Sequence, residues 1–188
     1  MEEYAAGNQN WALTQGGNDE IYIANNEGVL MYDAERWKLY PMNSIVRSVA
    51  FFDGVLYSGS YMDFGYWKKQ TTGDLVYQSL VEQYQIQLIE DEQFWQIYQI
   101  EDTLIFQSLN RIFLFNQSTN EFKQIQPDKP IIKSFVVNEQ LFFHLENDGI
   151  YTYDLNGIKY LFGRKQFGDT EVIEIFSLSD GFRILTSS

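Results

Sequence analysis

The chain has 188 residues, of which 45% are hydrophobic and 17% are aromatic, enough apolar surface for one substantial core. Its formal net charge of −13, from 26 acidic and 13 basic residues, argues against contact with nucleic acid or an anionic membrane surface. Cysteine is absent, which excludes disulfides, thiolate metal sites and cysteine nucleophiles, and no apolar run approaches the roughly 18 residues of a membrane span.

One pattern of four strands recurs along the sequence. An apolar first strand is expected at residues 11–14, 45–51, 94–99 and 131–137. A second strand, a polar or glycine-containing turn and an aromatic-rich third strand follow within residues 20–33, 55–69, 103–116 and 140–154. Polar return strands are expected at residues 36–40, 75–79, 121–125 and 158–162. The best helical candidate is the segment 80–92, which interrupts the period.

The length of the repeat indicates a β-propeller. Four short strands in about 40 residues are typical of a propeller blade, and about this spacing separates the landmark aromatics Tyr32, Trp67, Phe115 and Tyr153. The predicted fold class is all-β, a β-propeller with four-stranded antiparallel blades at residues 8–42, 44–80, 94–126 and 131–163. A half blade is expected at 170–188, where Ser179-Asp180-Gly181 matches the turn Phe52-Asp53-Gly54. Residues 1–7 are interpreted as a leader without the features of a signal peptide.

About four and a half blades form an incomplete ring. In a closed propeller each blade face is covered by the next, so an open end exposes an apolar sheet face to water. At about 25 cal/mol per Å², several hundred Å² of uncovered apolar surface costs many kcal/mol. We therefore expect either a fragment of a longer protein or self-association.

The sequence offers little for catalysis or metal binding. The single histidine, His144, shares a second-strand position with Ala24, Gly59, Gln107 and Thr186, which favours a packed or hydrogen-bonded histidine over a ligand or catalyst. The acidic run at residues 90–92 favours a solvated loop over an acid–base pair, and the sequence contains no calcium-loop motif. We expect no catalytic residue, metal or cofactor in this segment.

Ligand-binding candidates come from the geometry of the predicted fold. The loops that join second to third strands, and one blade to the next, gather at one face of a propeller, where ligands commonly bind. Asparagine, aspartate and tyrosine suit a carbohydrate there, although they are also ordinary turn residues. The candidates are Asn25, Asn26, Tyr61, Asp63, Asn110, Asn147, Asp148, Arg164 and Lys165.

Arg47 is a further candidate because it lies in a first strand, which is otherwise mostly apolar. Such a cation lining the channel either pairs with an acidic neighbour or holds an anionic ligand such as a uronate. The sequence leaves both interpretations open.

Several segments are more specific than the general repeat. NQNWALTQ at residues 8–15, NNEGVLMYD before Trp37, SIVRSVAF at 44–51 and YSGSYMDFGYW at 57–67 resemble one family. This family comprises the N-terminal periplasmic propellers of Bacteroidetes-type sensor regulators, which contain two-component regulator propeller repeats and a triple-tyrosine domain. FWQIYQI, IFQSLNRIFLF and SFVVNEQLFFHLENDGIYTYD extend the resemblance over essentially the whole chain.

The resemblance implies a signal-transduction role. A family propeller has about seven blades, follows a signal peptide, and precedes a β-sandwich, one transmembrane helix and a cytoplasmic histidine kinase or helix-turn-helix module. The expected function is therefore a periplasmic domain of a membrane receptor that senses a glycan breakdown product and regulates transcription. The expected partners are an oligosaccharide, the remaining blades and the β-sandwich. Alternatives from other classes are a protein-interaction propeller scaffold and a propeller-fold polysaccharide-active enzyme.

Overall fold

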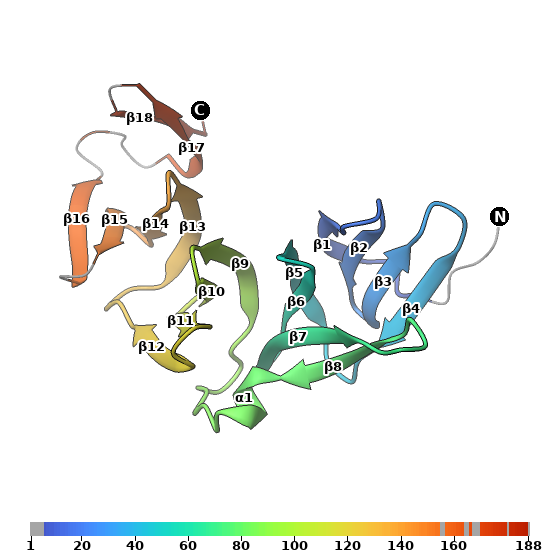
Figure 1. Cartoon of the computed structure of the whole chain (residues 1–188). Coiled ribbons are helices and arrows are strands. Elements are labelled where there is room, and N and C mark those ends of the chain that lie inside the picture. Colours follow the sequence, from blue (N-terminus) through green and yellow to red (C-terminus); the bar gives the residue numbers. More distant parts are fainter. Residues whose placement is uncertain (1–5, 155–156, 164–165, 167–169, 180, 188) are drawn as a thin grey trace. The chain divides into compact units, whose positions relative to one another are not determined.

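The computed structural model describes residues 6–154, 157–163, 166, 170–179 and 181–187. Almost every described element is a β-strand, and the strands form consecutive antiparallel sheets (Figure 1). Among the described residues, no helix is long and apolar enough to cross a membrane. Arg164 and Lys165, both predicted as site residues, lie outside the described residues.

Four sheets have four strands each, joined in chain order. The first contains β1 (Asn10–Gln15), β2 (Ile21–Asn25), β3 (Gly28–Tyr32) and β4 (Trp37–Pro41). The second contains β5 (Val46–Phe52), β6 (Val55–Ser60), β7 (Asp63–Lys69) and β8 (Leu75–Ser79). The third contains β9 (Phe94–Ile100), β10 (Thr103–Ser108), β11 (Ile112–Asn116) and β12 (Glu121–Ile125). The fourth contains β13 (Ile131–Val137), β14 (Gln140–Leu145), β15 (Gly149–Asp154) and β16 (Gly157–Gly163).

A two-stranded sheet of β17 (Val172–Leu178) and β18 (Gly181–Thr186) follows the fourth sheet. The chain divides into two compact units. The first unit comprises Met1–Gln99 and Ile105–Ser108, and the second comprises Ile100–Leu104 and Leu109–Ser188.

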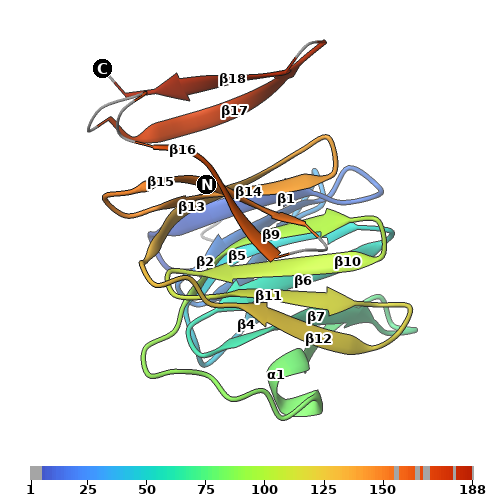
Figure 2. The same cartoon turned by 90° about the vertical axis from the view of Figure 1, so that its left-hand side faces the viewer.

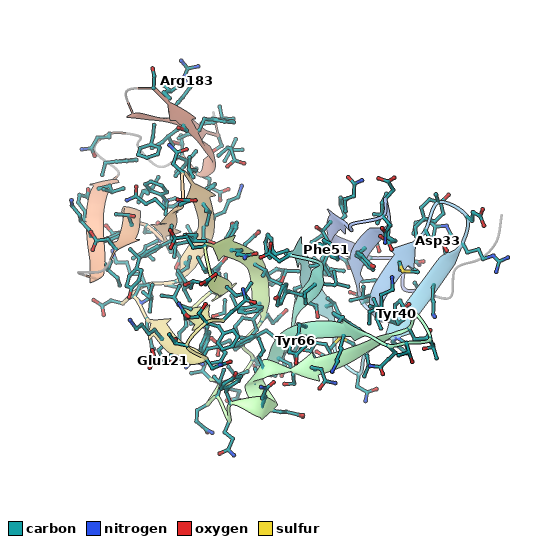
Figure 3. The ribbon with its side chains drawn as sticks, viewed as in Figure 1. Asp33, Tyr40, Phe51, Tyr66, Glu121 and Arg183 are labelled. Atoms are coloured by element: carbon teal, nitrogen blue, oxygen red, sulfur yellow. The ribbon has the colours of Figure 1, made fainter. Side chains whose placement is uncertain are left out.

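Aromatic side chains fill the core of the first unit. Alternation along β2 buries Tyr22 and Ala24, which pack with Val29, Tyr40, Val46, Val49, Leu56 and Trp67. Phe51 of β5, labelled in Figure 3, stacks on Tyr22 with 6.1 Å between ring centroids. Phe64 contacts both Phe94 and Phe106, at 4.6 and 4.4 Å between centroids. Large flat side chains therefore fill the space between the twisted sheets of this unit.

The second unit has an apolar core of its own. Phe135, Phe142, Ile150, Val172 and Ile175 form one buried cluster, so that β17 packs on the fourth sheet (Figure 2). The Phe142 and Phe182 rings meet edge to face at 4.9 Å between centroids, and Ile184 packs against the same cluster.

Two sequence expectations need correction. Only Leu80–Gln83 of the segment 80–92 is helical, as α1, which Ser79 caps by accepting a hydrogen bond from the Glu82 amide. The helix cannot continue because Gln85 has φ of 52°, outside the helical region.

In the last sheet Leu178 pairs with Gly181, just as Phe52 pairs with Val55 in the second sheet. Thr186 therefore corresponds to Ser60. It lies one position beyond the second-strand position of His144, to which the sequence had assigned it.

Candidate functional site

A β-bulge marks the start of the first strand in four of the sheets. The pairing shifts register between Asn10 and Ala12, and an equivalent shift occurs in the three sheets that begin with β5, β13 and β17. The extra residues at these bulges are Trp11, Arg47, Ile132 and Ile173. A bulge redirects a side chain away from the regular ladder and is frequent next to binding sites. Trp95 is the second residue of β9 and has the corresponding place in the repeat.

The bulge residues Trp11 and Arg47 of the first unit form a cluster with Trp95. The Arg47 guanidinium carbon lies 3.9 Å from the centroid of the Trp11 ring and 4.9 Å from that of the Trp95 ring. The two indoles meet edge to face at 5.8 Å between centroids. The Arg47 Nε–H donates to Gln93 Oε1 at 2.8 Å. Both tryptophans therefore stabilise the cation through its interaction with their rings. We call Trp11, Arg47, Gln93 and Trp95 the Arg47 cluster.

Two N–H groups in this cluster have no acceptor among the residues that the structure describes. Within the described part of the chain, neither Arg47 Nη1 nor Trp95 Nε1 has a hydrogen-bond partner, and both atoms are buried. Burial lowers the pKa of Arg47 because it removes water from the charged form. No carboxylate of the described residues pairs with Arg47, so the acidic neighbour, one of the two interpretations that the sequence left open, is not found.

Asn26 is connected to the Arg47 cluster through Trp11. The Trp11 Nε1–H donates to Asn26 Oδ1 at 2.8 Å, and 36% of Trp11 is exposed. Asn25 has a different role because it is fully buried. Its Nδ2 donates to the carbonyls of Gly7 and Gln9, and its Oδ1 accepts from the Glu27 amide at 3.0 Å. Asn25 therefore fixes the entry into the first sheet, whereas Asn26 lies beside an exposed indole.

Tyr61 lies in the turn that follows β6, and Asp63 is the first residue of β7. The Tyr61 hydroxyl donates to Asp91 Oδ1 at 2.7 Å, and the Tyr61 backbone forms a β-bridge with Gln93. Asp63 accepts a hydrogen bond from Ser79 Oγ at 2.7 Å, and burial raises the pKa of Asp63. The turn is thus tied to the segment that carries Gln93 into the Arg47 cluster.

Three predicted site residues lie in the second unit. Asn110 and Asn147 are exposed, and Asn147 has φ of 53°, as turn residues often do. Asp148 pairs with Lys129 at 3.0 Å and accepts a hydrogen bond from the Tyr151 hydroxyl. The lysine contact lowers the pKa of Asp148. Asp148 and Tyr151 line a cavity of about 360 Å³ in this unit.

The acidic run at residues 90–92 is only partly solvated, which corrects the sequence prediction. Glu90 and Asp91 are exposed, but Glu92 is only 1% exposed. Glu92 accepts hydrogen bonds from Ser108 Oγ at 2.7 Å and from the Ile89 amide at 3.2 Å. Its carboxylate therefore anchors the end of the segment after α1.

Among the described residues, no group of three or more His, Cys, Asp or Glu side chains is placed to hold a metal ion.

His144 lies in β14 and is 5% exposed. Burial lowers its pKa, and the nearby Glu171 and Asp148 oppose this shift only in part. The residue is therefore a neutral, packed histidine at neutral pH, as the sequence favoured.

The sequence prediction included Arg47 but missed Trp11, Gln93 and Trp95. A signal for both tryptophans was present, since each occupies the same place as Arg47 in its own first strand. Gln93 had no such signal because its role depends on how the segment after α1 returns to β9.

No protein-family model and no curated protein matches the sequence. Solved structures do match the fold. Virginiamycin B lyase from Staphylococcus aureus is 15% identical, with a TM-score of 0.69, and the match covers 96% of this chain and 65% of that one. A streptogramin B lyase is 18% identical, with a TM-score of 0.66, and the match covers 98% and 63%.

A third similar structure is the extracellular domain of a hybrid two-component system from B. thetaiotaomicron. It is 14% identical, with a TM-score of 0.67, and the match covers 94% of this chain and 25% of that one. The chain is a β-propeller. Its all-β fold with four-stranded antiparallel blades is confirmed. The propeller spans less than two thirds of the length of each of these structures.

Proposed function

We propose that this propeller is the non-catalytic, ligand-sensing part of an extracytoplasmic signalling receptor, and that its ligand is a glycan breakdown product. The observation that carries the proposal is the Arg47 cluster, in which a cation, an exposed indole and unpartnered N–H donors meet at redirected positions. Aromatic faces and fixed donors are the groups that bind sugars. The similarity to the extracellular domain of a two-component system supports the receptor context.

The mechanism requires two states of the receptor. A ligand changes signalling only if it binds one arrangement of the receptor more tightly than another. In this proposal the Arg47 cluster supplies that difference, and the periplasm is where the propeller meets its ligand. Signal output lies in other parts of the receptor, either a kinase or a DNA-binding module.

The test uses the parent receptor in its own cells. Transcription of its target genes is measured after addition of defined oligosaccharides, and the experiment is repeated with residues 8–188 deleted. We expect a response to at least one saccharide that is lost on deletion. A response that persists after deletion would assign sensing to another domain. Turnover of a glycan by the purified chain would contradict a non-catalytic role, and capture of a protein ligand in place of a saccharide would favour an interaction scaffold.

A further inference from the structure

The Arg47 cluster identifies a chemical class of ligand, provided that the proposed sensing function holds. The guanidinium is partly withdrawn from water, yet among the described residues its ring contacts and its hydrogen bond are made with neutral groups, namely two indoles and one amide. A planar guanidinium binds a carboxylate through two parallel hydrogen bonds, which are about twice as strong as bonds between neutral groups. An unpaired, half-buried arginine in a chain of net charge −13 therefore favours a ligand that brings the counter-charge.

The second unpartnered donor narrows the chemistry. Trp95 Nε1 is an N–H group that can only donate, so it needs an acceptor atom just as Arg47 Nη1 does. A small planar group with two acceptor atoms offers one acceptor to each of these donors. Trp11 adds a partly exposed indole in the same cluster, and a pyranose ring packs on such a side chain.

We propose that Arg47, Trp95 and Trp11 form a binding site for a carboxylate-bearing sugar, such as a uronic acid. The carboxylate accepts hydrogen bonds from Arg47 Nη1 and Trp95 Nε1, and the sugar ring packs on Trp11. Gln93 holds the guanidinium in place through Nε. The same chemistry is offered by a free sugar acid and by the acidic end of an oligosaccharide.

Binding in this way requires the Trp11 ring to move. Both free donors are buried, and the Trp11 ring covers the guanidinium at 3.9 Å. Trp11 is the exposed member of the cluster, so its rotation opens the site and breaks its hydrogen bond to Asn26 in the turn between β2 and β3. Ligand binding is thereby coupled to that turn, which gives the sensor a local conformational response.

The experiment compares matched acidic and neutral sugars on the 188-residue chain. Galacturonic acid is titrated against galactose by calorimetry at neutral pH, with intrinsic tryptophan fluorescence as a second signal. We expect the acid to bind at least about tenfold more tightly, since a charge-assisted pair contributes more than about 1.4 kcal/mol. An oligogalacturonate measured beside the monomer shows which source of the carboxylate the site prefers.

Substitutions locate the binding. Arg47→Gln is expected to abolish the preference for the acid, Arg47→Lys to weaken it, and Trp95→Phe to weaken it while keeping the ring. Arg111→Gln is the matched control, because Arg111 also lies over an aromatic ring, Phe113, at 4.9 Å in the second unit. Melting curves confirm that each variant is folded. Trp11→Phe should reduce the fluorescence change, because Trp95 then gives the only tryptophan signal from the site.

Three outcomes would overturn the inference: equal binding of acid and neutral sugar, acid binding that survives Arg47→Gln, or binding of neither. The proposed sensing function fails separately. A parent receptor that responds to neutral saccharides equally well with Arg47→Gln overturns the acidic site and leaves sensing intact. A receptor that responds to no saccharide overturns sensing, even if the isolated chain binds galacturonate.

Discussion

Arg47 is held by side chains that carry no formal charge, and the chemistry of arginine explains how this is stable. A guanidinium is more weakly hydrated than an ammonium, and each indole face contributes about 0.5 to 2 kcal/mol depending on desolvation. A lysine at the same position would lose the stacking and the directed Nε contact with Gln93. The sequence pointed to Arg47 as an unusual residue and offered an acidic neighbour or an anionic ligand as its partner, because pairing rules ignore aromatic faces.

Glu92 is a buried carboxylate with a structural role. Replacement by alanine leaves Ser108 Oγ and the Ile89 amide without this acceptor. Hydrogen bonds to charged groups contribute about 1.5 to 3 kcal/mol each, so we expect Glu92→Ala to lower the free energy of unfolding by roughly 2 to 4 kcal/mol. Urea denaturation measures the change. The exposed neighbour substitution Glu90→Ala is the control and should have an effect within about 0.5 kcal/mol. Equal effects of the two substitutions would contradict a buried role.

His144 predicts a pH dependence of stability. Burial lowers its pKa below the ordinary 6.5, so the unfolded chain takes up a proton at a higher pH than the folded chain does. The stability contribution is therefore complete above the unfolded pKa and decreases as the pH falls through about 6.5 toward the folded pKa. We expect thermal unfolding between about pH 7 and pH 5 to show a shallower decline for His144→Gln than for the original chain. Parallel profiles for the two proteins would show that His144 does not contribute.

At the scale of elements, strand positions were predictable and bulges were not. The first and return strands lie within one residue of the positions that the repeat predicted, because alternation and turn residues are local signals. The extra residue at Trp11 or Arg47 shifts pairing with a neighbouring strand, so it depends on contacts outside the local sequence. The failure of the predicted helix after Gln83 has a similar cause. Residues 84–92 instead return to the sheet. The Met62 amide donates to the Glu92 carbonyl, and Tyr61 forms a β-bridge with Gln93.

Gly59 of β6 allows close packing of two elements in the first unit. A Cβ at this position would lie 2.5 Å from Ser48 Oγ and 2.7 Å from Phe94 Cβ, closer than real contacts permit. The Ser48 hydroxyl donates to the Phe94 carbonyl at 2.9 Å, so it has little freedom to move. We expect Gly59→Ala to cost about 1 to 3 kcal/mol of stability through overpacking.

Denaturant unfolding of Gly59→Ala is compared with that of Gly17→Ala. At Gly17 a new Cβ would meet only Phe51, at an ordinary distance of 3.6 Å. Because Phe94 adjoins Trp95, Gly59→Ala should also perturb the Arg47 cluster and change the intrinsic tryptophan fluorescence. A stability equal to that of the Gly17 variant would show that β6 and β9 have room to separate.

At the scale of the whole molecule, two properties of the surface oppose each other. The net charge of −13 repels a second copy at low ionic strength, and salt screens this repulsion. The outer face of β17 and β18 favours association with a second copy, since it is apolar. Phe176, Leu178 and Leu185 are each more than 40% exposed there. Arg183, labelled in Figure 3, and Glu174 lie on the same face. The balance between these terms decides whether isolated chains associate.

We predict that the 188-residue chain self-associates, and more so as salt increases. Sedimentation velocity over a range of concentrations should give a weight-average mass above the 22.1 kDa of one chain. Phe176→Glu with Leu185→Lys should return the protein toward the monomer, because both changes place charge on the apolar face. Val76→Glu is the control, since Val76 is similarly exposed at 43% but lies on β8. If the original chain stays monomeric at every concentration and salt level, the outer face of β17 and β18 is stable in contact with water and the prediction is wrong. If the double variant still associates, the contact lies on another surface.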